Sequence, residues 1–355
     1  MSGEITATFI YTDTMRIWNY FIDTQALNEI YAGFPLWGLL LAISITVFLL
    51  SRGADRMIDG AVGLALRTGL PKVVIGATIL SLGTTAPEAF VSVMAAYMGD
   101  PGLALGNGVG SIIADTGLIF GLTALVAAPP VNRWILNRTG WWQTGSAFLL
   151  VALAGVAILI SPGAPVISRQ MGLFLLLLLA AYMIMTYKWA STGNNTEEPE
   201  TGNPDSLFLI LVSLIGGLIL VIIASRLLIP AAGETARRLG VPEDVIAATM
   251  VAFGTSLPEL TTAIAAIGKG QPEITVGNIV GADVLNVLFV IGAASLAVPL
   301  AIPPNFFHFH FPFMLLILVS FRIFISLDRN GRFKRWQGGW LLMLYILYIV
   351  LQYAL

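Results

Sequence analysis

Long apolar stretches alternate with short polar segments along most of the chain. Ten of these stretches predict membrane-spanning helices, because a bilayer core needs about 20 mostly apolar residues per helix. They lie near residues 35–51, 72–98, 103–127, 142–161, 170–188, 206–227, 243–267, 274–299, 309–326 and 338–354. We therefore expect an all-α polytopic membrane protein with ten transmembrane helices, the first of which is short and extends into its flanks.

Two polar segments divide the chain. Residues 1–34 are mixed and aromatic-containing, and we expect an extracytoplasmic or interfacial segment there. Residues 191–205 (STGNNTEEPETGNPD) are acidic, contain Gly and Pro and lack periodicity, which predicts a solvated cytoplasmic linker between halves 35–190 and 206–355. A calcium-sensing role for the linker acids is the alternative, although the segment lacks a ligand-spaced loop with a turn glycine. Those acids are Glu197, Glu198 and Glu200.

Composition supports the membrane assignment and excludes several other classes. Apolar residues make up 57% of the chain and charged residues 11%, against roughly 25% charged residues in soluble proteins. The net charge of −2 gives no reason to expect a nucleic-acid partner. The chain contains no cysteine, which excludes disulfides and thiolate metal sites.

The basic residues of the connecting segments predict the orientation. With ten spans, 13 Lys and Arg side chains fall on one face and 5 on the other, and the richer face is normally cytoplasmic. This partition places both termini outside the cytoplasm, as expected for a multi-pass protein of the cell (inner) membrane.

An internal repeat relates the two halves. Residues 71–117 (PKVVIGATILSLGTTAPEAF to GNGVGSIIADTG) align without a gap to residues 242–288 (PEDVIAATMVAFGTSLPELT to GNIVGADVLNVL), at a constant offset of 171 positions. The identical pairs include Gly, Pro, Asn and Glu, which chance similarity between apolar helices would not produce. We place the two-helix repeat motif of each half at 71–127 and 242–299. They begin in the second and seventh spans and so cross the membrane in opposite directions, which predicts two inverted-topology five-helix repeats.

Each repeat carries a carboxylate beside a helix-disrupting proline in mid-span. Pro87 and Pro258 each remove a backbone donor, which frees the carbonyl four residues earlier, and the carbonyls of Thr84 and Thr255 lie close by. Glu88 or Glu259 follows directly, and an ionisable residue inside a membrane is a functional hypothesis by default. A purely structural hydrogen bond at each glutamate is the alternative interpretation.

The second helix of each repeat adds further oxygen donors. Five positions after its last motif glycine lies Asp115 or Asn286. Carboxylate, amide, hydroxyl and carbonyl oxygens suit hard cations such as calcium and sodium. Both histidines, His308 and His310, lie outside the repeats, which disfavours zinc and copper.

At these residues the sequence resembles the calcium/cation antiporter superfamily, and specifically its prokaryotic sodium/calcium exchangers. The motifs here read GTTAPE with GNGVGSIIAD and GTSLPE with GNIVGADVLN. The resemblance implies exchange of calcium for sodium by alternating access, without a cofactor and without enzyme activity. It also implies that the first and sixth spans slide as gate helices outside the repeat core.

The resemblance further implies the ligands of a central site. The four central ligands are Glu88, Asp115, Glu259 and Asn286. The backbone carbonyls of Thr84 and Thr255 are implied to bind the calcium ion as well. The sodium sites are completed by Ser111, Thr85, Ser256 and the carbonyls near Ser81 and Ala252.

Two departures from the family pattern affect these sites. Asp115 and Asn286 are exchanged between the repeats relative to the family, which preserves three carboxylates in total. Ala282 replaces a family serine, which weakens one sodium site. Asp283 replaces the Asn that follows this serine in the family, and the equivalent position of the first repeat holds the apolar residue Ile112. Asp283 is therefore a further candidate cation ligand or a proton carrier.

Other functions stay open at this stage. In a calcium/proton antiporter, protonation of the carboxylates replaces sodium binding, and a potassium-coupled exchanger is a further alternative. A membrane enzyme with Glu88 and Glu259 as an acid/base pair lacks a nucleophile–histidine constellation, and a passive channel fits inverted repeats less well than a carrier. The sequence predicts calcium, sodium or protons and the lipid bilayer as partners, with no nucleic acid and no defined oligomeric state.

Overall fold

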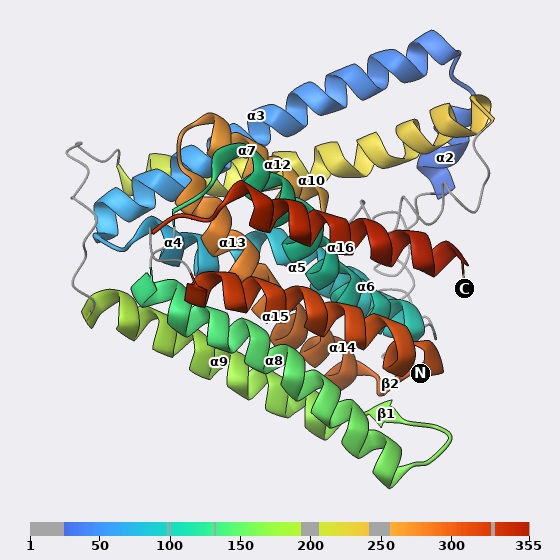
Figure 1. The fold of residues 1–355 in the computed structure, drawn as a ribbon. Helices are drawn as coiled ribbons and strands as arrows, with labels where there is room; N and C mark the ends of the chain where they lie inside the picture. The colour runs from blue at the N-terminus through green and yellow to red at the C-terminus, as the bar shows by residue number, and fades with distance from the viewer. Residues whose placement is uncertain are drawn as a thin grey trace, which may run out of the picture.

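The computed structural model describes residues 25–97, 99, 101–130, 133–192, 206–240, 256–327 and 331–354. These residues form an almost entirely helical molecule (Figure 1). The first half contains α2 (Gln25–Ala32), α3 (Leu36–Thr68), α4 (Lys72–Ile75), η1 (Gly76–Leu80), α5 (Ser81–Tyr97), α6 (Pro101–Ile113), η2 (Ala114–Phe120), α7 (Gly121–Ala127), α8 (Arg133–Ile160), β1 (Val166–Ile167) and α9 (Arg169–Thr192), where η marks π-helix. The second half contains α10 (Leu207–Arg238), α12 (Leu257–Gly268), α13 (Pro272–Leu285), η3 (Asn286–Ile291), α14 (Gly292–Ala297), β2 (Leu300–Ala301), η4 (Phe306–His310), α15 (Phe311–Leu327) and α16 (Arg335–Ala354).

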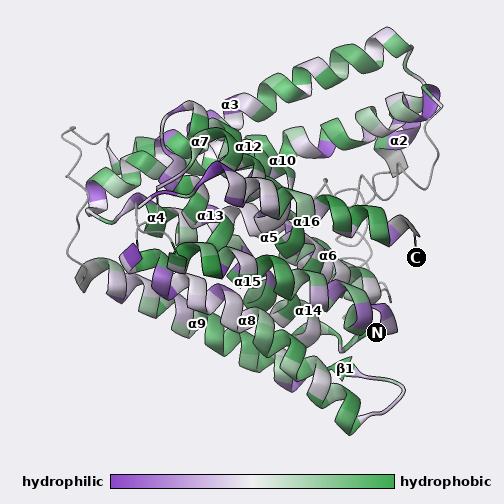
Figure 2. Ribbon diagram, in the orientation of Figure 1, coloured by the Kyte–Doolittle hydropathy of each residue, from purple (hydrophilic) through white to green (hydrophobic). Residues whose placement is uncertain are grey.

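Within the described residues, 8 continuous helices are long and apolar enough to cross a membrane. They correspond to eight of the ten predicted spans, and hydrophobic residues occupy much of their length (Figure 2). The seventh predicted span, 243–267, is described only from residue 256, and α12 begins at Leu257. Helix α16 occupies the tenth predicted span. The count of ten therefore stays a prediction.

Several predicted span boundaries are wrong, because the helices α3, α8 and α10 extend beyond the apolar stretches that predicted them. The helix that begins at Leu36 continues to Thr68 instead of ending at residue 51, and the one predicted from residue 142 begins at Arg133. The sixth span continues to Arg238 instead of residue 227. Backbone hydrogen bonding propagates a helix beyond the lipid-facing stretch whatever the polarity of its side chains. Helix α3 ends at Gly69, whose φ of 68° suits a residue without a Cβ.

The helices that carry the sequence repeat form the centre of the molecule. Of the most apolar stretch in each helix, 83% is buried for Pro272–Ala297 and 72% for Pro101–Ala127, against 22% for α3 and for α9. The outer helices thus leave most of their surface exposed, as lipid-facing helices do. The repeat helices place their polar groups in the interior.

Helices α3 and α10 pack against each other along much of their length, at one edge of the molecule (Figure 1). A Cβ added at Gly217 would lie 2.6 Å from the carbonyl oxygen of Gly53. Gly60 approaches Leu214 and Gly63 approaches Ile210, so the two helices run antiparallel. Small residues at such a crossing allow close backbone contact.

Short backbone pairings join the connecting segments at the two ends of α8. Beyond its end at Ile160, β1 pairs antiparallel with β2, with Val166 opposite Ala301. Before its start at Arg133, Pro130 forms an isolated bridge with Arg332. Both pairings link the first half of the chain to the second.

Candidate ion-binding site

Glu88 and Glu259 both lie in the interior, with 1% and 2% of their surface exposed. Glu88 lies in α5, and Glu259 lies in the first turn of α12. The helix break expected at Pro87 is wrong for the first repeat, because α5 continues through this proline from Ser81 to Tyr97. Proline still removes a backbone donor there, while packing on both sides preserves the helical path. The irregular turn in this span is instead η1, directly before α5.

Asp115 and Asn286 lie at the beginning of two π-helical segments. Asp115 is the second residue of η2, and Asn286 is the first residue of η3. Ordinary α-helix resumes at Gly121 and at Gly292, which are 171 positions apart, the offset of the sequence repeat. Single π turns inside helices occur frequently at functional sites, since they turn side chains and carbonyls out of the regular spiral.

The helices of the two repeats pack crosswise around these side chains. Helix α5 contacts η3 and α14, and α12 contacts η2 and α7, so the first helix of each repeat packs against the second helix of the other. The backbones of η1 and α13 approach closely, since a Cβ at Gly76 would lie 2.5 Å from the carbonyl oxygen of Ile274. This packing brings polar groups from both halves into one interior region.

The acidic groups of this region interact electrostatically with one another. The Glu88 carboxylate interacts by charge repulsion with the carboxylates of Glu259 and Asp115. The Asp115 carboxylate interacts in the same way with those of Glu259 and Asp283. The ion pairs found in the described part of the chain join Glu234 to Arg237 and Arg238, and Asp59 to Lys269. No described Lys or Arg forms an ion pair with the four interior acids. Buried like charges without a counter-charge strongly attract cations.

Eight oxygen atoms in this region are buried and have no hydrogen-bond partner in the described structure. They are Thr85 Oγ1, Glu88 Oε2, Ser111 Oγ, Asp115 Oδ1, Ser256 Oγ, Glu259 Oε2, Asp283 Oδ1 and Asn286 Oδ1. Buried polar atoms are normally hydrogen-bonded, so each exception needs an explanation. Oxygens that coordinate a cation would explain all eight.

The other predicted ligands differ in how they are placed. The Thr84 hydroxyl bonds to the Ser81 carbonyl and to Asn278 Oδ1, both at 3.3 Å, and it lies beside the Glu259 carboxylate. Thr255, with Gly254 and Ala252, lies outside the described residues. Among the described residues, no three Asp, Glu or His side chains form a cluster that could bind a metal by themselves. Any ion would therefore need neutral oxygens as well.

The motif asparagines join helices within the repeats. Asn107 donates to the Glu88 carbonyl at 3.2 Å and to Ser92 Oγ at 2.9 Å. Asn278 Nδ2 lies 3.5 Å from the Thr262 hydroxyl, which bonds to the Glu259 carbonyl at 3.0 Å. In both repeats, the asparagine therefore connects the second helix to the backbone beside the glutamate.

The sequence interpretation missed Gln143 and Thr116. Gln143 lies in α8, outside both two-helix repeat motifs, with 1% of its surface exposed, and its amide donates to Asp283 Oδ2 at 2.6 Å. Thr116 also donates to Asp283. A glutamine at the start of an otherwise apolar span was the available signal, because a buried amide in a membrane helix needs a polar partner.

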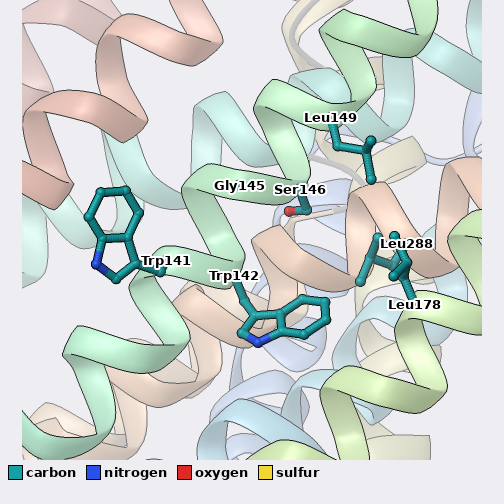
Figure 3. Close-up of a pocket in the computed structure, with 7 residues that line it drawn as sticks. All are labelled: Trp141, Trp142, Gly145, Ser146, Leu149, Leu178 and Leu288. Atoms are coloured by element: carbon teal, nitrogen blue, oxygen red, sulfur yellow. The ribbon is translucent and has the colours of Figure 1, made fainter.

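A hydrogen-bonded histidine and a pocket are two further features of the described structure. His310 hydrogen-bonds to Tyr348 at 2.9 Å and to Asn305 at 3.1 Å. A pocket of about 290 Å³ lies over Gly145 of α8, where Trp141 and Trp142 point to different sides of the helix (Figure 3). None of the predicted ligands lines this largely apolar pocket.

Comparisons with known proteins show which family and which solved structures this chain resembles. The family model described as "Sodium/calcium exchanger protein" matches residues 37–188 and 209–354. The chain is 33% identical over 296 residues to the "Inner membrane protein YrbG" of Escherichia coli, covering 80% of this chain and 89% of that protein. It is 27% identical over 346 residues to the "Sodium/calcium exchanger MaX1" of Methanosarcina acetivorans, covering 87% and 97%. A solved structure of the sodium-calcium exchanger NCX_Mj, soaked with Na⁺ and Sr²⁺, matches with a TM-score of 0.74 and 28% identity, covering 89% of this chain and 99% of that one.

Proposed function

Because this chain belongs to the sodium/calcium exchanger protein family, we propose that it is an antiporter that exchanges calcium for sodium across the membrane. The observation that carries this proposal is the set of buried, unpaired oxygens contributed by both halves of the chain. Transport would proceed by alternating access, with calcium and sodium competing for the same carboxylates.

The proposed central ligands are Glu88, Asp115, Glu259 and Asn286, with the carbonyls of Thr84 and Thr255 on calcium. The proposed sodium sites add the hydroxyls of Thr85, Ser111 and Ser256. Three of the four central ligands are acids, so the empty site would hold up to three buried negative charges. Each unneutralised charge costs several kcal/mol in such surroundings. That penalty would prevent the empty carrier from changing its access, which makes exchange obligatory.

The proposed architecture consists of two inverted five-helix repeats with both termini outside the cytoplasm. The equivalent positions of η2 and η3 and the crosswise packing of α5 and α12 support the repeat. The excess of Lys and Arg on one face supports the orientation. A reporter enzyme that is active only outside the cytoplasm, fused after Leu355, would be inactive if this orientation is wrong.

The proposed moving part is the pair formed by α3 and α10. These helices pack mainly on each other, at the edge of the molecule, while their apolar stretches are only 22% and 28% buried. A pair with few interior contacts can slide past the repeat helices without disrupting the ion site.

The test is uptake of radioactive calcium into sodium-loaded vesicles that contain the purified protein. We expect uptake to stop in Glu88→Gln and in Glu259→Gln, and calcium binding measured by isothermal titration to fall at least about tenfold, as the loss of a charged ligand predicts. Glu273→Gln, at the first turn of α13, is the matched control and should behave as wild type. Unchanged uptake in both glutamate variants would end the proposal.

A calcium/proton antiporter is the second candidate, and Asp283 and Ala282 favour it. The extra acid could carry a proton, and the missing serine hydroxyl weakens a sodium site. Calcium uptake driven by an imposed pH gradient without sodium would identify this function instead.

A further inference from the structure

A second polar cluster lies beside the proposed central site. It is formed by Asp283 of α13, Thr116 of η2 and Gln143 of α8. The Gln143 amide donates to Asp283 Oδ2 at 2.6 Å and to the Thr116 hydroxyl at 3.3 Å, and Thr116 donates to the same Asp283 oxygen. Three elements that are distant in the sequence therefore meet at one carboxylate.

The hydrogen bonds of this cluster leave two oxygens unpaired. Asp283 Oδ1 and Gln143 Oε1 are buried and have no partner in the described structure, and both side chains are 1% exposed. Because Gln143 Nε2 contacts the carboxylate, the carbonyl oxygen of the same amide group lies within a few ångström of it. The cluster thus offers a carboxylate oxygen and an amide oxygen, with a threonine hydroxyl beside them.

Within the part of the chain that the structure describes, no basic side chain neutralises the charge of Asp283. No described Lys or Arg pairs with it, and the charged groups that act on it and on its neighbour Asp115 are other acids. Two hydrogen bonds stabilise a buried carboxylate only in part, so a bound cation is favoured there. Oxygen ligands of this kind suit a hard cation, and one carboxylate balances one positive charge.

We propose that Asp283, Gln143 and Thr116 form a sodium site of their own, on the α8 side of the central site. This inference rests on the proposed exchange of calcium for sodium. The site would replace the sodium ligand lost at Ala282, the residue that directly precedes Asp283. Helix α8, which lies outside both two-helix repeat motifs, thereby takes part in coupling.

The experiment measures the number of sodium ions exchanged for each calcium ion. Full-length protein in vesicles is given a tenfold sodium gradient at zero membrane potential, and the final calcium accumulation is recorded. At equilibrium the calcium ratio equals the sodium ratio raised to the number of coupled sodium ions. Losing one sodium ion therefore lowers calcium accumulation about tenfold.

We expect this tenfold loss in Asp283→Asn and in Gln143→Leu, with calcium affinity by isothermal titration unchanged within about twofold of wild type. Thr139→Val is the matched control, because Thr139 lies one turn before Gln143 on α8, is buried, and bonds only to the Ile135 carbonyl at 3.1 Å. This variant should accumulate calcium as wild type does.

Several outcomes would overturn the assignment. Unchanged accumulation in both variants would mean that no coupled sodium binds there. If the variants still exchange the wild-type number of sodium ions per calcium ion but no longer exchange a coupled proton, the cluster binds a proton instead. If they lose a dependence of transport on potassium, the cluster binds potassium instead. The proposed function fails separately, if the wild-type protein itself accumulates no calcium under the sodium gradient.

Discussion

At the scale of single residues, the hydroxyl groups of the repeats fall into two classes. Thr78 and Thr262 bond back to carbonyls of their own helix, at 2.7 and 2.8 Å, as hydroxyls in apolar helices usually do. Thr85, Ser111 and Ser256 are buried, whereas Thr78 is only partly buried. The hydroxyls of Thr85, Ser111 and Ser256 do not bond back to their own helices, and the Ser256 hydroxyl lies beside the Asp115 carboxylate. The second class leaves its oxygens available, which separates candidate ligands from packing residues more sharply than residue type alone.

This contrast gives a prediction for Ala282, the repeat mate of Ser111, which is fully buried. In Ala282→Ser, we expect the sodium concentration for half-maximal exchange to fall about three- to tenfold, since one added oxygen ligand contributes roughly 1 kcal/mol. Sodium titration of calcium uptake provides the measurement. Ala294→Ser, at a fully buried position of α14, is the control. Equal behaviour of the two variants would mean that position 282 does not face a sodium ion.

The sequence revealed the repeated acids but not their non-repeated partner. Glu88 and Glu259 could be identified from the sequence because each lies in a repeated motif with identical Gly and Pro residues. Two unrelated apolar helices would not share such residues by chance. Gln143 has no repeat mate, and its partner Asp283 lies 140 positions away. Only the three-dimensional packing of α8 on α13 pairs them, so no pattern along the chain could have predicted the contact.

At the scale of elements, apolar length predicted the existence of helices better than their form. Apolar stretches report the part of a helix that faces lipid, so they missed the polar continuations of α3, α8 and α10. The π segments η1, η2 and η3 were also not predicted, because a π turn depends on how a helix is held by its neighbours rather than on local propensity. The π segments η2 and η3 nevertheless lie at equivalent positions of the two repeats. Because Asp115 and Asn286 lie at their beginnings, this irregularity is linked to the site.

The crossing of α3 and α10 gives a prediction with a control at the adjacent position. A Cβ at Gly217 would lie 2.7 Å from the Met57 backbone nitrogen, whereas one at Gly216 meets nothing within 4 Å. We expect Gly217→Ala to destabilise the protein by about 1–3 kcal/mol through overpacking, while Gly216→Ala is neutral or slightly stabilising. Thermal unfolding in detergent measures both, and equal melting temperatures would contradict the close crossing.

At the scale of the whole molecule, the buried apolar residues separate into two main clusters. One is built largely from α3 and α10, including Met57, Leu214 and Val221, and it also contains four residues of the repeat helices: Ile75, Leu80, Ala266 and Ile274. The other unites the repeat helices with α8, α9, α15 and α16. Most of the first cluster therefore lies within the α3–α10 pair, and few of its residues come from the repeat helices. A packed core resists deformation, so relative motion is expected at the boundary between this pair and the repeat helices. The boundary is crossed at the surface by the ion pair of Asp59 and Lys269, at 2.6 Å.

A reversible cross-link across this boundary tests the motion directly. The chain contains no cysteine, so Asp59→Cys with Lys269→Cys provides a unique pair for a short, reducible bifunctional thiol reagent. We expect the cross-link to abolish calcium uptake and a reducing agent to restore it, because α3 would be fixed to the end of α12. Calcium binding should persist in both states, since these exposed positions lie apart from the interior acids.

The matched control is a cross-link inside the moving pair, Gly63→Cys with Ile210→Cys, where a Cβ at Gly63 lies 3.0 Å from Ile210 Cγ1. If α3 and α10 move as one body, this link leaves uptake intact, and only the link to α12 inhibits. Inhibition by both links would indicate that α3 and α10 slide past each other instead. Full uptake with α3 tied to α12 would mean that access changes elsewhere in the molecule, and motion at this boundary would then no longer describe how this protein transports ions.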